Sequence, residues 1–383
     1  MFKFCCISTL KTDAVYLSMN LKEISSFLEM LAPLAFQEDY DNSGLIVGHP
    51  DKEITGALIS LDCTESVVDE AIQLGLNLII SHHPIVFKGL KRFNGKTYVE
   101  RVVMKAIKHD IAIYAIHTNL DHIAAGVNKK ICDKLGIKNP SILKPREDSL
   151  RKLVTFCPEG FAEELRGAMF NAGAGHIGNY SECSYNVSGL GTFKAGEGAE
   201  PFVGELGKLH HEPEIRIETI YPLNLEQKIL AALIEKHPYE EVAYDLYSLN
   251  NSHPQVGSGM IGNLECDIDE LEFLTFVKKK LGAKAIRHTA LRSKKVRRVA
   301  VCGGSGSFLL PNAISAGADV FISADFKYHE FFDAESKLII ADVGHFESEQ
   351  FTQELLLDLI SEKFSNFALR LTTQYTNPIN YLI

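Results

Sequence analysis

The sequence predicts an α/β protein made of two related lobes, with a smaller α+β domain inserted between them. Two observations lead to this prediction. Apolar strands alternate with amphipathic helices in the first part of the chain, and one helix–strand unit returns near the other end. Such alternation is typical of a mostly parallel sheet. The returning unit indicates a duplicated half-domain, and the segment between the two copies follows a different pattern.

The composition is that of a globular protein with a sizeable core. With 383 residues, 46% hydrophobic and 23% charged, the chain can form two or three domains. A net charge of −10 without a basic block argues against a general role on nucleic acid or membrane surfaces. No apolar stretch approaches the length of a membrane span. Eight cysteines without a CxxC pair favour reduced thiols in the cytoplasm.

The first lobe is predicted over 19–149. An extension, 1–18, receives no predicted structure, and Met19 is a second candidate for the start of the protein because an amphipathic helix follows it directly. Strands and helices then alternate, with strands expected at 54–61, 76–81 and 112–116 and helices at 65–74 and 99–109. This order predicts a βαβ arrangement with parallel strands.

The second lobe is predicted over 253–383, from an internal repeat. Residues 71–81 align without gaps on 313–323 and are identical at five of eleven positions. Both segments have a helix end, a glycine and then an apolar strand. In this register His82 and His83 correspond to Ala324 and Asp325. Two related lobes can face each other, and a site between them is then natural.

The inserted domain is predicted over 150–252. Its pattern is a strand, a helix, two strands around a glycine-rich stretch, a helix and a strand, with the outer elements at 152–156, 162–172, 225–236 and 242–249. This order suggests a ferredoxin-like fold. The glycine-rich stretch is interpreted as a flexible hairpin, since no strand-to-helix context supports a phosphate-binding loop.

Two adjacent histidines are the first candidate site. His82 and His83 follow an apolar strand and precede Pro84, which ends regular pairing. Ligands in α/β proteins bind at the carboxyl ends of strands. Successive strand side chains point to opposite faces, so neighbouring imidazoles serve two ions more easily than one. The pair therefore suggests a two-metal site.

Two further clusters also follow predicted strands. One holds His117 and Asp121, and the other holds His345 and Glu349, which are four residues apart and share a face of a helix predicted to reach about Ile360. The predicted metal ligands are His82, His83, Asp121, His345 and Glu349. Imidazoles and carboxylates suit zinc, iron or manganese, and the carboxylates could bridge two ions. Such a pair of ions would generate hydroxide and hold a substrate oxygen.

Each candidate also has an ordinary structural explanation. A single histidine at a strand end is usually a hydrogen-bonded turn residue, Asp121 could cap a turn, and Glu349 could stabilise a helix N-terminus. Three clusters at three strand ends together favour metal. Asp325 and His329 could bind substrate or transfer protons, or form a polar strand exit. The glycine loop 302–307 could bind an anion or be a tight turn.

These motifs resemble the Nif-three-like family, whose members are known as GTP cyclohydrolase 1 type 2 homologues. The resemblance runs from Met19 through nearly the whole chain, and a tryptophan is more usual at Tyr40. The matching segments are 40–48, 81–84, 117–121, 317–325, 328–329 and 344–349. The resemblance implies two related α/β lobes around a dinuclear metal site, the five ligands named above, and a toroidal homohexamer. Residues 237–245 are similar to the PII/CutA-like domain of longer members.

The resemblance leaves two classes of function open. The first is a metal-dependent hydrolase of a nucleotide or related small molecule, GTP cyclohydrolase-like, in which His329 and His117 shuttle protons. The second is a metal-binding regulatory or scaffold protein whose inserted domain senses a ligand. Nothing in the sequence specifies guanine or the metal. The net charge of −10 mildly disfavours a polyanionic substrate, although local basic residues could offset it. These are Lys88, Lys91, Arg92 and Lys327.

Overall fold

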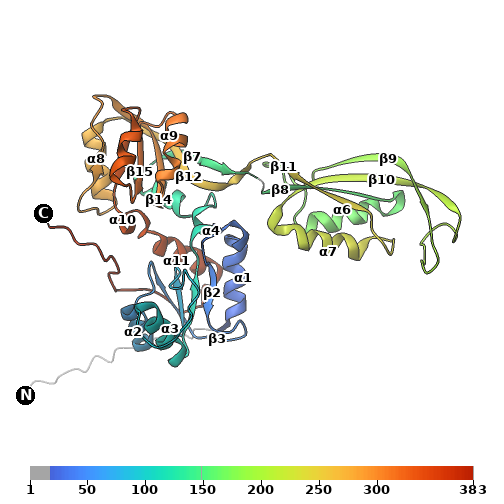
Figure 1. Ribbon diagram of the computed structural model, residues 1–383, viewed down its shortest axis with the longest axis horizontal. Coiled ribbons are helices and arrows are strands. Elements are labelled where there is room, and N and C mark those ends of the chain that lie inside the picture. Colours follow the sequence, from blue (N-terminus) through green and yellow to red (C-terminus); the bar gives the residue numbers. More distant parts are fainter. Residues whose placement is uncertain (1–17, 148, 383) are drawn as a thin grey trace, which may run out of the picture. The chain divides into compact units, whose positions relative to one another are not determined.

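The computed structural model describes residues 18–147 and 149–382, which form two compact units (Figure 1). The first unit contains both predicted lobes, up to Leu143 and again from Gly259, and the second unit contains residues 144–258. The predicted N-terminal extension lies outside the described residues, apart from Ser18. Every helix in the described part of the chain is too short or too polar to span a membrane.

The first lobe contains a five-stranded sheet in the order β17-β4-β5-β6-β2. The four strands from β17 to β6 are parallel, and β2 pairs antiparallel at the edge. Their bounds are β2 Gly44–Val47, β4 Ala57–Ser60, β5 Leu78–Ser81, β6 Ala112–Ala115 and β17 Leu369–Leu371. The strand expected at 54–61 is split, because β3 (Glu53–Ile54) pairs instead with β1 (Met19–Asn20). Gly56, at the break, leaves room for Ala368, which a Cβ would approach to 2.9 Å.

Three capped helices surround this sheet. They are α1 (Leu21–Leu31), α2 (Glu65–Leu74) and α3 (Tyr98–Lys108), and each starts where an Asn or Thr side chain accepts a backbone N–H bond. Helices α2 and α3 lie side by side (Figure 1) and bury a core against β4, β5 and β6. The short helices α4 (Thr118–Asp121) and α5 (Val127–Leu135) follow β6. The sheet is thus buried, as its continuous apolar strands require.

The second lobe contains a six-stranded sheet in the order β13-β16-β15-β14-β12-β7. Strands β14, β15 and β16 are parallel. The bounds are β7 Lys138–Arg146, β12 His253–Asp269, β13 Arg287–His288, β14 Lys295–Ser305, β15 Val320–Ala324 and β16 Ile339–Asp342. Its helices are α8 Glu270–Lys280, α9 Leu310–Ser315 and α10 His345–Glu349, whereas α11 Thr352–Lys363 contacts β4, β17 and α5 of the first lobe. The single helix expected from 345 to about 360 is therefore broken after Glu349.

The predicted repeat has the same local structure in both lobes. The first copy ends α2 at Gly75 (φ 67°) and continues into β5, and the second passes α9 and Gly317 (φ 71°) before β15. Both glycines have the left-handed conformation that L side chains rarely adopt. Both following strands are buried and run parallel to the strand before the helix.

The second unit is a four-stranded antiparallel sheet in the order β11-β8-β10-β9. Helices α6 and α7 pack on each other and on one face of the sheet (Figure 1). The elements are β8 Leu150–Pro158, α6 Ala162–Asn171, β9 Ser184–Lys194, β10 Leu209–Pro222, α7 Glu226–Lys236 and β11 Tyr244–Leu249. All six predicted elements are present in the predicted order.

Candidate metal centre

The chemically distinctive residues come together within the first unit, at the carboxyl ends of the parallel strands. His82 and His83 follow β5, His117 follows β6, and Asp121 ends α4. The backbone of the histidine pair continues the pairing of β5, since His82 N–H and His83 N–H donate to the carbonyls of Ser60 and Leu61. This pairing fixes both imidazoles at the rim of the sheet. The second lobe brings α10, with His345 and Glu349, to the same place.

One group of three residues surrounds the buried His82 side chain. Its Nε2 atom lies 3.6 Å from Asp121 Oδ1 and 3.9 Å from Glu349 Oε1, both longer than hydrogen bonds. Among the described residues, His82 Nε2 and Asp121 Oδ1 are buried without any hydrogen-bond partner. Such atoms are costly inside a protein. A cation held between them would satisfy both, so these residues fit a metal ion.

The second group shares the same glutamate. Glu349 Oε2 lies 2.9 Å from His83 Nε2 and 3.0 Å from His345 Nε2, and the two imidazole nitrogens are 3.4 Å apart. These three side chains can also hold a metal ion. Glu349, with an exposed fraction of 3%, therefore directs one oxygen into each group. Glu349 would therefore be the ligand that two bound ions share.

His117 borders the first group. Its ring lies edge-on to both His82 and His83, with centroid separations of 5.2 and 5.4 Å. The three histidines also form a possible metal-binding group, with ligand atoms within 4.8 Å of one another. His117 is thus placed either to donate to the ion beside His82 or to exchange protons with what is bound there.

A second layer of acceptors holds the Nδ1 atom of each imidazole and leaves Nε2 facing inward. This is the usual support of metal-binding histidines. The pairs are His82 with Ile116 O (2.8 Å), His83 with Asp62 (2.7 Å), His117 with Asp41 (2.8 Å) and His345 with Asp325 (2.6 Å). The sequence pointed to Asp325, but Asp62 was missed. Its position two residues after β4, the neighbour of β5, could have revealed it.

The charges of the two groups are strongly linked. Burial raises the pKa of Glu349, but the charge of His345 and the hydrogen bonds from His345 and His83 together outweigh it and hold this pKa well below its usual range. That same attraction raises the pKa of His345 to about 11, against the effect of burial. Burial also opposes protonation of His83, yet its hydrogen bonds to Asp62 and Glu349 raise its pKa to about 9. The pKa of Asp121 is raised, chiefly by burial.

A glycine loop makes room for the shared carboxylate. Gly304, at φ 60°, lies so close to Glu349 that a Cβ there would be 2.3 Å from Oε1. Its N–H donates to Ser348 Oγ, and the N–H of Gly303 donates to Asn128 Oδ1. Since these amides are already occupied, the close approach to Glu349 explains the glycines better than anion binding.

His329 lies apart from these groups. It is exposed on a 3₁₀ turn (Tyr328–Ala334), where its ring packs near Tyr328 and Phe332 at centroid distances of 5.2 and 6.4 Å. It belongs to none of the metal-binding groups found in the described part of the chain. Its role in proton transfer stays a prediction.

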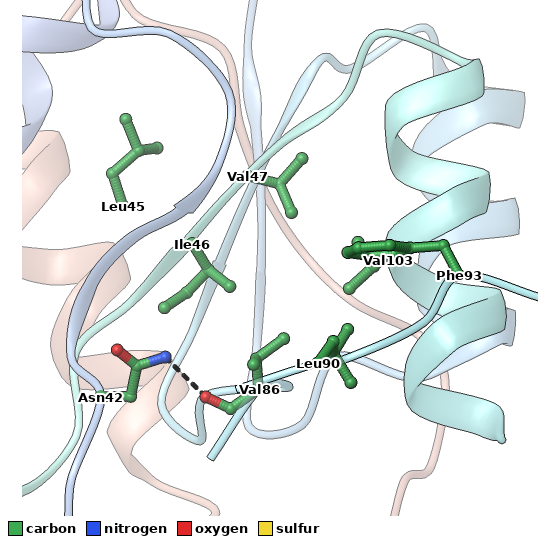
Figure 2. A pocket seen from close by; sticks show the side chains of 8 residues that line it. All are labelled: Asn42, Leu45, Ile46, Val47, Val86, Leu90, Phe93 and Val103. Atoms are coloured by element: carbon green, nitrogen blue, oxygen red, sulfur yellow. Dashed lines mark hydrogen bonds between the residues drawn. The ribbon is translucent and has the colours of Figure 1, made fainter. Parts of the chain in front are cut away.

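A cavity of about 290 Å³ lies at the edge of the first sheet (Figure 2). Asn42 donates from Nδ2 to the carbonyl of Val86 (2.6 Å), and the other lining side chains are apolar. They are Leu45, Ile46, Val47, Val86, Leu90, Phe93 and Val103. Asn42 directly follows Asp41, and Val86 precedes Phe87, whose ring packs against His117 at 5.5 Å. The cavity wall is therefore continuous with the residues that position His117.

Comparison with known proteins identifies the family to which this architecture belongs. The family model for Duf34/NIF3 (NGG1p interacting factor 3) matches residues 19–378. The chain belongs to this family. It is 38% identical over 371 residues to the GTP cyclohydrolase 1 type 2 homolog of Bacillus subtilis (strain 168), covering 95% of this chain and 99% of that protein. The protein of the same name from Halalkalibacterium halodurans is 40% identical over 368 residues, with the same coverage.

Solved structures of family members have the same fold. A Bacillus cereus protein related to NIF3 is similar with a TM-score of 0.81 and 40% identity, over 95% of this chain and 99% of that one. A Staphylococcus aureus protein gives a TM-score of 0.76 with 28% identity, over the same shares. The mixed α/β architecture is therefore that of the NIF3 family.

Proposed function

We propose that this NIF3-family protein holds two divalent metal ions. His82, Asp121 and Glu349 would bind one ion, and His83, His345 and Glu349 the other. The observation that carries the proposal is the buried pair His82 Nε2 and Asp121 Oδ1, which has no hydrogen-bond partner in the described chain. The nitrogen and oxygen donors suit zinc, iron or manganese.

We further propose hydrolysis of a nucleotide or a related small molecule, as the relatives named for GTP cyclohydrolase suggest. Bound ions of this kind lower the pKa of water and polarise a substrate oxygen. The protein's own contribution is to hold and move protons. Hydrogen bonds to His117 and Thr118 outweigh the effect of burial and keep the pKa of Asp41 far below its usual range. Asp41 can then keep a proton on His117 Nδ1, so that Nε2 accepts one at the site. His329, exposed to solvent, would be the second proton carrier.

The cavity supports a small-molecule ligand. Its volume of about 290 Å³ is close to the lower limit of ligand pockets. Its apolar lining with one amide suits a flat ring better than a polyanion. Asn42 Nδ2 already donates to Val86 O, so Asn42 Oδ1 would be the acceptor for a ring N–H.

A regulatory or scaffold function is the second candidate, and the second unit favours it. Strand β9 is a sheet edge with exposed Tyr185 and Leu190, features of an interaction surface. We propose that residues 150–252 form an inserted ferredoxin-like, PII/CutA-like domain, since the elements follow the order β-α-β-β-α-β. In this function the domain would sense a ligand and the metals would stabilise the lobes. For either function we propose a homohexamer located in the cytoplasm, and the free cysteines of the described chain are in keeping with that compartment.

Metal analysis combined with turnover tests the proposal. The purified protein and its Glu349→Ala variant are assayed for bound metal and for hydrolysis of a panel of nucleotides. Two equivalents of metal and hydrolysis, both lost in the variant, would support the enzyme. Two equivalents without turnover of any nucleotide would favour the regulatory function. Full metal content in a His83→Ala variant would contradict the site itself.

A further inference from the structure

The last described segment, 372–382, has neither helix nor strand, and its residues from Thr372 to Asn377 make hydrogen bonds to other elements. It follows β17 in the first unit (Figure 1, ending at C). Thr372 N–H donates to Ile59 O (2.9 Å), and the hydroxyls of Thr372 and Thr373 donate to the Glu70 carboxylate. The first residues of the segment are thus anchored on the first lobe.

The next contact reaches the support of a proposed metal ligand. Thr376 Oγ1 donates to Asp62 Oδ2 at 2.6 Å, while Asp62 Oδ1 lies 2.7 Å from His83 Nδ1. One carboxylate therefore connects the segment to the imidazole. Without the hydroxyl, Asp62 keeps the His83 contact but is free to rotate about its own side-chain bonds.

The following residue reaches the second lobe. Asn377 is buried and donates from Nδ2 to Glu347 Oε1 at 3.1 Å. Glu347 lies on α10 between His345 and Glu349, and the Tyr375 ring packs on the adjacent Phe346 with a centroid distance of 5.0 Å. Consecutive residues of the segment thus hold a carboxylate from each lobe.

These contacts converge on the second metal-binding group. Glu349 Oε2 meets His83 at 2.9 Å and His345 at 3.0 Å, so a turn of the His83 ring or a shift of α10 would separate the three side chains. We propose that 372–382 is a strap that sets the geometry of this group, with Thr376 and Asn377 as positioning residues. Thr376 acts through Asp62 on His83, and Asn377 acts through Glu347 on α10. The inference rests on the proposed metal centre and is independent of hydrolysis.

Zinc affinity and the His83 ring signal test the strap. In the full-length protein, Thr376→Val removes the hydroxyl while keeping the shape of the side chain, and Thr376→Ser keeps the hydroxyl. Thr373→Val is the matched control, since its hydroxyl also binds a carboxylate, Glu70 Oε1 at 2.7 Å, on helix α2. Affinity is measured by competition with a chromophoric chelator. The Nδ1 proton of His83 is followed in metal-free, ¹⁵N-histidine-labelled protein and assigned by its loss in His83→Asn.

We expect Thr376→Val to weaken one of the two zinc equivalents about 3–10-fold, below the 10–100-fold typical of a direct partner of a metal-binding histidine. The His83 Nδ1 signal should broaden through faster exchange. Thr376→Ser and Thr373→Val should match the parent protein in both measurements. Asn377→Ser is an independent variant that should weaken the same equivalent and leave the His83 signal unchanged.

Equal effects of Thr373→Val and Thr376→Val would overturn the strap, because the segment would then be general packing. Unchanged affinity and ring signal in Thr376→Val would overturn it as well. If the parent protein bound no zinc, the proposed metal centre would fail, while the His83 signal of the metal-free protein would still decide whether Thr376 positions the ring.

Discussion

Replacement of Glu349 by alanine should remove both metal ions at once. Glu349 is the residue common to the two groups, with Oε1 facing His82 and Oε2 between His83 and His345. Each group then keeps only two of its three proposed ligands. We expect zinc stoichiometry to fall from two per chain to none at micromolar free zinc.

The change in stability separates into two parts. In metal-free protein the variant loses two charge-assisted hydrogen bonds, one of them to the partly exposed His345, so the free energy of unfolding should fall by about 2–4 kcal/mol. With each ion at 100 times its dissociation constant, zinc should stabilise the parent protein by about 2.7 kcal/mol per site, or about 5 kcal/mol for both. In Glu349→Ala this second, zinc-dependent part should disappear.

Urea unfolding with and without zinc, together with metal analysis, measures both parts. Glu270→Ala is the matched control, because Glu270 is buried to a similar degree and pairs with a cation, Arg292 at 3.2 Å, on a different part of the second lobe. The control should lose stability in metal-free protein but keep the full zinc increment. If Glu349→Ala retained two equivalents, or Glu270→Ala lost them, a carboxylate shared between two ions would be refuted.

Three further outcomes follow from the same geometry. His345→Ala and His82→Ala should each bind one zinc by equilibrium dialysis, and loss of both ions from either variant would show that the two groups are not separable. At pH 7 the raised pKa values of His83 (about 9) and His345 (about 11) keep both side chains protonated in metal-free protein. Zinc must displace these protons, so its apparent affinity should rise with pH. Titration calorimetry in buffers of different ionisation enthalpy should detect proton release, and equal heats in all buffers would contradict this expectation. Gly304→Ala should lose metal, because its Cβ would clash with the shared carboxylate. Gly75→Ala has the same positive-φ strain but open space around it, so this control should bind metal normally. Equal metal content in the two variants would count against this steric argument.

The strands and the outline of the site could be predicted because their signals are local. Apolar runs and periodicity define β5 and β6, and parallel strands end at the same edge of a sheet. The alternation of side chains along a strand suggested that His82 and His83 serve different ions. In the structure His82 lies near Asp121 and His83 lies near His345, and the assignment to two ions stays a prediction.

The supporting contacts could not be predicted because they join distant parts of the chain. Asp41 and His117 are 76 residues apart, and Asp62 and Thr376 are 314 apart. No periodicity relates such pairs, and a three-residue strand such as β17 gives almost no pattern of its own. The break after Glu349 is also invisible in the sequence, which reads as one helix.

In the proposed metal centre, each of the two ions would take ligands from both lobes. The first group takes His82 and Asp121 from the first lobe and Glu349 from the second, and the other group takes only His83 from the first lobe. In these two proposed groups neither lobe supplies all three ligands, whereas the group His82, His83 and His117 lies wholly in the first lobe. An ion bound to either group therefore stabilises the packing of the lobes, and a force that separates the lobes weakens both sites together. Segment 372–382 binds a carboxylate of each lobe, so it would oppose separation of the lobes as the proposed metal ions would.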